Sequence, residues 1–433
     1  MNIAKKILQY IFRVQAKMVL KRFHPKIIAI TGSVGKTSTK EAIYAVLKEK
    51  YTVRKSPKSY NSMEWGVSLT ILGLVSEWNN PAGWISNIGK GIMTLMASDY
   101  PEMVIVEMGV DHPGDMDVMV SLAKPDIAVV TAIGDIPVHV EFFAGPKELA
   151  LEKGRIVRAV SSDGYVILNS DDDVVHDMRA EAHGTVRTFG VGRGADVHVS
   201  GYKLTTTGKE HHVIPKGIAC KADYRGTSVP IHLEGVFGKQ QMYVIGAAVA
   251  VGLSLNMNMV DIARALEKNY MPSPGRLRLL PGIKESWILD DTYNASPMAM
   301  HAALDTLKDM PGVRRIAVLA DMLEIGKFTI KAHESMGMLA APIANVLITV
   351  GPRAKFIAQE ARARGMKKTD VVECVSAEEA GSYLQSIMEP GDVILVKGSQ
   401  SMRMEKVVEE IMAHPEDAGD LLVRQDSYWK TKT

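Results

Sequence analysis

The 433-residue chain has only two cysteines, Cys220 and Cys374, which lie far apart and outside any CxxC pattern. This scarcity excludes a disulfide framework, argues against a zinc site and fits a reducing compartment such as the cytosol. Internal repeats and low-complexity tracts are also missing. With 46% hydrophobic and 23% charged residues, the composition is that of a folded protein, long enough for two or three domains.

Long apolar runs are missing as well. No stretch of about 18 apolar residues occurs, so we expect no transmembrane span. Basic residues interrupt every apolar run at the N-terminus, so no signal-peptide core is present and export is not expected. These basic residues are Lys5, Lys6, Arg13, Lys17, Lys21 and Arg22.

Residues 1–24 carry apolar residues at spacings of three and four, and no acidic residue precedes Glu41. This pattern predicts a basic amphipathic helix. Two interpretations fit the helix: packing on the protein itself or on a partner, or peripheral contact with an anionic membrane surface. Because the net charge of the whole chain is only +2, we expect no nucleic-acid partner.

Short β-branched runs and helix-forming stretches alternate along the chain and predict an α/β fold. The polar stretch 195–234 is typical of hairpins or an edge insertion rather than core. The tail after His414 is expected to be loosely held. Buried strands are expected at 27–31, 103–106, 127–130 and 165–168, and later at 287–289, 316–319, 346–350 and 393–396.

Two prolines and a glycine in residues 271–275 cannot continue the helix predicted at 260–269, so they predict a domain boundary. We expect three parts: the helix 1–24, a central ATP-binding domain at 25–271 with a mostly parallel sheet, and a C-terminal Rossmann-like α/β domain at 272–433.

The loop after the first predicted strand carries the most specific chemistry. It consists of Gly32, Ser33, Val34, Gly35, Lys36, Thr37 and Ser38. Glycines let backbone N–H groups approach phosphate oxygens, Lys36 adds positive charge, and the Thr37 hydroxyl can ligate Mg²⁺. Only the second half of the usual GxxxxGK[ST] motif is present, so a glycine-rich turn with an incidental lysine is the alternative. The strand before the loop and the helix after it favour binding of ATP phosphates.

Three further polar residues are candidates for the site. Glu107 places a carboxylate at the carboxyl edge of the sheet, where α/β proteins bind ligands and where it could hold Mg²⁺. His139 and Lys153 are individually weak signals, because a lone histidine or lysine is usually structural or solvated.

Several motifs in one order resemble those of the Mur ligase family, most closely its MurF-type members, which add D-alanyl-D-alanine to a muramoyl tripeptide. The similarity runs from about residue 26 to about residue 412. The motifs are Ile30 to Ser38, Asn61 to Gly66, Val106 to Gly109, Asn169 to Asp171, Pro274 to Leu277, Asp290 to Pro297, Ala320 to Gly326 and Val396 to Ser399.

The resemblance implies a site for ATP and two Mg²⁺ ions. Thr37 and Glu107 match the ligands of one ion, and His139 and Lys153 match those of the second. The family's lysine is carbamylated, so Lys153 would present a hard anionic oxygen instead of an ammonium group. Lys36, His139 and Lys153 are the expected catalytic residues.

The resemblance also assigns residues of the C-terminal domain to the nucleotide. Arg276 matches an arginine that reaches the phosphates, and Asp291 and Asn294 match residues that bind ribose and base. Taken alone, Asp291 and Asn294 could form a turn, and Arg276 could form a salt bridge in the linker.

Two departures from the family pattern bear on the substrates. Where MurF-type proteins have GxHNxxNxxAA, this chain replaces the histidine and both asparagines between Gly238 and Ala248, although Gln241 retains an amide that could contact adenine. The family's N-terminal domain, which holds the UDP-sugar, has no counterpart before the P-loop strand in this sequence.

The predicted function is ATP-dependent formation of an amide bond through an acyl phosphate, in synthesis of a cell-wall peptide precursor. The substrates would be a peptide acceptor and an amino acid or dipeptide, in the cytoplasm or at the inner face of the membrane. A lipid-linked or pseudomurein-type acceptor is one alternative. A nucleotide-binding partner protein without turnover is the other. The sequence does not indicate an oligomeric state.

Overall fold

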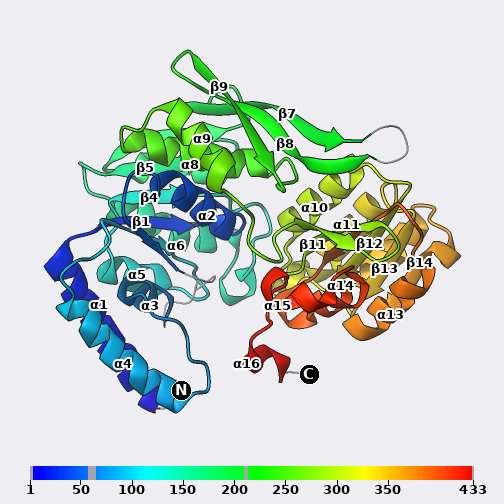
Figure 1. The fold of residues 1–433 in the computed structure, drawn as a ribbon, viewed down its shortest axis with the longest axis horizontal. Helices are drawn as coiled ribbons and strands as arrows, with labels where there is room; N and C mark the ends of the chain where they lie inside the picture. The colour runs from blue at the N-terminus through cyan, green and yellow to red at the C-terminus, as the bar shows by residue number, and fades with distance from the viewer. Residues whose placement is uncertain (1–2, 57–64, 209–212, 432–433) are drawn as a thin grey trace.

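The computed structural model describes residues 3–56, 65–208 and 213–431. Two α/β units lie side by side, and the helices α1 (Ile3–Phe23) and α4 (Pro81–Met96) form an arm on the first unit (Figure 1). The predicted α/β class, with a mostly parallel sheet in the first unit, is confirmed. The predicted motif that starts at Asn61 falls largely outside the described residues.

The first unit contains a sheet that has nine strands within the described residues. Neighbouring strands are parallel from β2 to β7, and β7, β8 and β9 pair in antiparallel hairpins. In spatial order the strands are β2 (Val53–Lys55), β3 (Met103–Glu107), β1 (Lys26–Thr31), β4 (Ile127–Val130), β5 (Tyr165–Asn169), β6 (Thr185–Gly190), β7 (Val197–Thr207), β8 (Ile214–Tyr224) and β9 (Thr227–Glu234).

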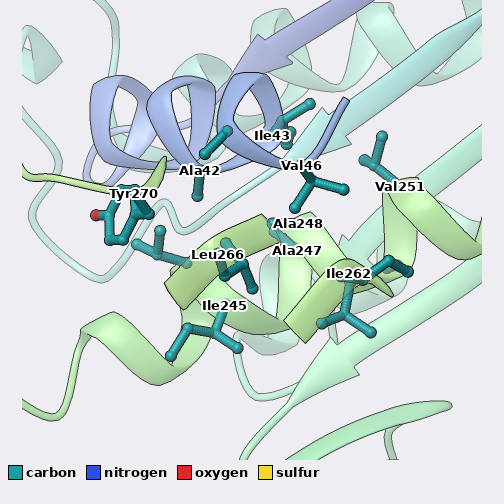
Figure 2. Close-up of a cluster of buried hydrophobic side chains, with 14 of the residues drawn as sticks. Ala42, Ile43, Val46, Ile245, Ala247, Ala248, Val251, Ile262, Leu266 and Tyr270 are labelled. Carbon is teal, nitrogen blue, oxygen red and sulfur yellow. The ribbon is translucent and has the colours of Figure 1, made fainter. Parts of the chain in front are cut away.

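Strand β1 lies between β3 and β4 with helices on both faces, which explains its continuous apolar sequence. Helices α2 (Lys36–Leu47), α8 (Gln241–Ser254) and α9 (Met259–Asn269) cover one face. Figure 2 shows Val46, Ala248 and Leu266 from these three helices in one apolar cluster. The other face is covered by α1, α3 (Gly66–Leu72), α5 (Asp115–Leu122) and α6 (Pro146–Ala159).

The stretch 195–234 forms the hairpins expected from its sequence, at the edge of the sheet. The expectation that it lies outside the core is wrong, because Val197, Ile218 and Ile231 are buried in the same cluster as α2 and α8. Apolar residues alternate with polar ones along these strands, so each strand buries one face while its composition stays polar.

The second unit contains a sheet of six strands within the described residues, parallel except for the antiparallel pair β10 and β11. In spatial order they are β10 (Arg278–Gly282), β11 (Ser286–Asp291), β15 (Asp392–Lys397), β12 (Arg314–Ala320), β13 (Val346–Val350) and β14 (Val371–Cys374). Helices pack on both faces, namely α10 (Pro297–Asp309), α11 (Thr329–Ala340), α12 (Lys355–Ala363), α13 (Ala377–Ile387) and α14 (Glu405–Ile411). The predicted boundary at 271/272 falls between α9 and β10.

The two ends of the chain are both packed on the protein. Helix α1 buries Phe12, Ala16 and Val19 against the first unit, and none of the described helices is long and apolar enough to cross a membrane. The expectation of a loosely held tail is wrong. Residues after His414 form α15 (Ala418–Leu421) and α16 (Ser427–Lys430), and Leu422 is buried in the second unit.

Candidate active site

The predicted phosphate loop joins β1 to the first turn of α2 at the carboxyl edge of the first sheet. Gly32 and Gly35 have φ angles of 139° and 87°, in the left-handed region that favours glycine. A Cβ on Gly32 would lie 2.1 Å from the Thr131 hydroxyl oxygen, so a larger residue does not fit. Thr131, just after β4, donates from its hydroxyl to the Val34 carbonyl at 2.6 Å and anchors the loop.

Lys36 lies inside the loop and not in solvent. Its ammonium group donates to the carbonyl of Gly32 at 2.9 Å, and burial lowers its pKa to about 8 despite the attraction of Glu107. The Ser33 hydroxyl is buried without a hydrogen-bond partner among the described residues. A buried unpaired group is costly, so a loop that holds one fits a polar ligand such as phosphate.

Thr37 and Glu107 lie together beside this loop. The Thr37 hydroxyl donates to the Glu107 carboxylate at 3.2 Å, and both residues are buried. Lys40 was not predicted as a site residue, yet its ammonium group lies 2.9 Å from Glu107 and is also buried. It follows Thr37 by three residues on α2, so both side chains are on one helical face. That spacing is the sequence signal that could have identified Lys40.

Lys153 and His139 approach the loop from the other side. Lys153 on α6 donates to the carbonyl of Gly32 at 3.3 Å, and burial, followed by the charge of Lys36, lowers its pKa to about 7. Burial and the charges of Lys153 and Lys36 lower the pKa of His139 to about 3, so its imidazole is neutral near pH 7. A neutral amine and a neutral imidazole are forms that can act as nucleophile or ligand.

Arg276 reaches the phosphate loop from the segment that joins the two units. Its guanidinium donates to the Thr37 hydroxyl at 3.2 Å and lies 3.9 Å from the ring centroid of Tyr293. Asn294 lies close to Asp291, because the Asn294 carbonyl and the Asp291 carboxylate both accept from Lys397. It lines a small cavity of about 70 Å³ that also borders Lys36 and His139, and its side-chain oxygen accepts from the Ala295 backbone. The structure thus places Asn294 at the phosphate end.

A larger cavity of about 450 Å³ extends from the loop between the two units and has the size of a small-molecule site. Ser38, Gln241 and Asp291 line it, as does Arg276. The side-chain oxygen of Gln241 accepts from the Tyr270 hydroxyl at 2.8 Å, so this oxygen is already used. Pairing of Gln241 with adenine would therefore use its amide nitrogen.

Lys397, at the end of β15, is a second residue that was not predicted for the site. Its ammonium group lies 2.6 Å from the Asp291 carboxylate and donates to the carbonyl of Asn294 at 2.9 Å. Lys397 lies within one of the recognised motifs, but only the fold brings its strand beside β11. It fixes the carboxylate that faces the larger cavity.

The residues present fit Mg²⁺ only in part. No three His, Cys, Asp or Glu side chains gather as a metal site in the described ranges. Magnesium is usually held by one or two carboxylates together with phosphate oxygens and water, and the Thr37–Glu107 oxygen pair beside the phosphate loop fits that pattern. At His139, carboxylate oxygens of Glu324 and Asp111 lie 3.3 Å and 3.7 Å from the imidazole nitrogens, and a carbamate on Lys153 would add a further anionic oxygen.

This geometry defines an ATP-binding protein whose site lies between two α/β units. Comparison with known proteins agrees. The profile of the Mur ligase middle domain matches residues 30–251, and that of the Mur ligase, glutamate ligase domain matches residues 275–400. The chain belongs to the Mur ligase family, as its motifs predicted, and is an ATP-dependent ligase that forms carbon–nitrogen bonds.

Several similar proteins share one enzyme name. The chain is 30% identical over 398 residues to the UDP-N-acetylmuramoyl-tripeptide--D-alanyl-D-alanine ligase of Mycobacterium leprae (strain TN), covering 87% of this chain and 71% of the relative. It is 28% identical over 405 residues to the enzyme of that name from Bacillus subtilis (strain 168), covering 92% and 79%. The fold is similar to MurF ligase from Thermotoga maritima in complex with ADP, with a TM-score of 0.73, 24% identity, and coverage of 95% and 84%.

Proposed function

We propose that the chain joins the carboxylate of a peptide acceptor to the amine of an amino acid or dipeptide, through an acyl phosphate, in synthesis of a cell-wall precursor. The observation that carries this proposal is the contact between Arg276 of the interdomain segment and Thr37 of the phosphate loop. It brings the second unit to the phosphate end, where a closed site can keep water from a reactive acyl phosphate.

The proposed reaction has two steps. An oxygen of the acceptor carboxylate attacks the γ-phosphorus of ATP, the bond to the bridging oxygen breaks, and ADP leaves. The amine nitrogen then attacks the carbonyl carbon, the carbon–oxygen bond to phosphate breaks, and the amine loses a proton as the amide forms. Lys36 and Arg276 both lie where the transferred phosphoryl group would bear negative charge.

The nucleotide and metal ligands are proposed from the same geometry. Adenosine would lie in the cavity lined by Ser38, Gln241 and Asp291. Thr37 and Glu107 would hold one Mg²⁺, and His139 with a carbamylated Lys153 would hold the second. Bound Mg²⁺ neutralises charge on the phosphate oxygens. The neutral amine of Lys153 is the form that combines with CO₂, releasing one proton.

The first prediction concerns the products. Incubated with MgATP, a panel of UDP-linked and lipid-linked peptide acceptors, and D-alanyl-D-alanine or single amino acids, the protein should release one phosphate for each amide formed. Mass spectrometry identifies the amide and a colorimetric assay counts the phosphate. Amide formation with a lipid-linked acceptor alone would assign the alternative substrate class. ATP binding without phosphate release for every pair of acceptor and amine would contradict the ligase function.

The arm formed by α1 and α4 favours an acceptor presented at a membrane. Both helices lack acidic residues and expose apolar side chains to solvent. Lysines such as Lys6, Lys17 and Lys21 lie among these side chains on α1. The exposed apolar residues are Ile7, Tyr10, Val14 and Met18 on α1 and Ile85, Ile92, Met93 and Met96 on α4. Basic helices with apolar side chains match an anionic lipid surface, and we propose this contact at the inner face of the membrane.

The second prediction tests this contact by liposome flotation. Changing Lys6, Lys17 and Lys21 together to glutamine should weaken binding to phosphatidylserine-containing vesicles at least tenfold, because each cation near an anionic surface contributes about 1 kcal/mol. The matched control changes three exposed lysines of the second unit to glutamine, namely Lys308, Lys367 and Lys368. Equal flotation of both variants would remove the proposed contact.

A further inference from the structure

The C-terminal segment 418–430 borders a cavity separate from the one proposed for adenosine. This cavity of about 610 Å³ is lined by Thr37 and Lys40 on the phosphate-loop side, by Arg276, and by Arg424 and Trp429 of the segment. The segment lies beyond the range 275–400 matched by the family profile.

The segment is fixed to the second unit by two arginines. Arg424 donates to the carbonyls of Thr292 at 2.8 Å and Tyr293 at 3.0 Å, and its side chain is almost fully buried. Arg403 donates to the carbonyl of Trp429 at 3.0 Å. Tyr293 is also the ring on which Arg276 stacks, so the segment supports the residue that reaches Thr37.

The segment contacts the first unit through aromatic rings. Tyr428 stacks on Trp78 with ring centroids 4.3 Å apart and planes 6° apart. Trp78 precedes α4, and its carbonyl accepts from the indole nitrogen of Trp84 at 2.9 Å. Figure 1 shows α16 extending from the second unit toward the side on which α4 lies. This stack adds a contact between the two units to those of Arg276 with Thr37 and of Lys239 with Asp309.

We propose that residues 418–430 act as a strap that completes the cavity wall and positions Arg276, and that the strap closes when Tyr428 stacks on Trp78. This inference rests on the proposed ligase function, with the cavity beside Thr37 receiving the reactants. Two buried atoms of lining residues, Arg276 Nε and Gln425 Oε1, have no hydrogen-bond partner within the described part. A donor and an acceptor left open in one cavity fit a polar ligand there.

The test compares Tyr428→Ala with Tyr428→Phe, which keeps the stacked ring. Tyr428→Ala should raise KM for the amine about fivefold and change kcat less than about twofold, as expected for loss of one aromatic stack. It should also release phosphate without amide, because water enters the opened cavity. Tyr428→Phe should keep both the KM for the amine and the ratio of amide to phosphate at their wild-type values. Val375→Ala, which shortens an exposed side chain of the second unit away from the arm and the cavities, is the control.

A second measurement separates the strap from the ligase function. Hydrogen exchange is compared in wild type, Tyr428→Ala and Trp78→Ala. Residues 424–430 should exchange faster in both variants than in wild type, whether or not an amide forms. If wild type forms no amide but residues 424–430 exchange faster in both variants, the ligase proposal fails and the strap stands. If the exchange rates, the KM for the amine and the ratio of amide to phosphate in Tyr428→Ala equal those of Val375→Ala, the strap is overturned.

Discussion

Replacing Lys36 with methionine is expected to lower kcat for amide formation about 10³-fold, because the charge that faces the transferred phosphoryl group is lost. Methionine keeps the unbranched shape of this partly buried side chain. Burial already lowers the pKa of Lys36 to about 8, so removing this cation should not unfold the protein. Steady-state kinetics and thermal unfolding measure the two effects.

The control for this variant is Lys26→Met, which removes an exposed lysine from the start of β1, the strand before the loop. It should leave kcat within about twofold of wild type, since surface substitutions away from a site have small effects. If Lys36→Met turned over as fast as Lys26→Met, the loop would not act on the phosphate that is transferred.

Replacing Lys153 with methionine is expected to lower kcat about 10²- to 10³-fold, because the carbamate oxygen proposed as a metal ligand is lost. Wild-type protein should show the carbamate by mass spectrometry at neutral pH, and its rate should rise on adding bicarbonate. Lys147→Met, on the exposed side of the same helix, should respond to bicarbonate like wild type.

The pH dependence of this effect has a definite sign. Burial lowers the pKa of Lys153 from 10.5 to about 7, so the amine that reacts with CO₂ is scarce below pH 7 and predominant above it. Stimulation by bicarbonate should therefore grow between pH 6 and pH 8. Stimulation that was equal in wild type and Lys153→Met, or absent at every pH, would contradict a carbamate on Lys153.

The phosphate loop could be predicted because its signal is local. A β-branched strand, two glycines in left-handed conformation and a lysine at a helix start lie within a dozen residues. Glu107 could be placed at the carboxyl edge of the sheet from its strand, whereas His139 and Lys153 could be connected to the loop only through the family resemblance, since no spacing relates them. The structure places all three around Gly32 to Thr37, and their roles stay predictions.

Other features depend on contacts that composition cannot reveal. The tail after His414 is polar and therefore suggested loose attachment, but Arg424 and Trp429 fix it through contacts with residues distant in the chain. Lys397 likewise gains its position near Asp291 only when β15 pairs with β11. Such positions follow from strand order, which local periodicity does not specify.

The measurement that tests the account most directly traces oxygen from the acceptor to phosphate. An acceptor in which a heavy isotope replaces both carboxylate oxygens is incubated with MgATP and the amine, and the released phosphate is analysed by mass spectrometry. Attack of the carboxylate on the γ-phosphorus predicts one heavy oxygen in each phosphate. Phosphate without the label, formed alongside the amide, would contradict an acyl phosphate and with it the proposed mechanism.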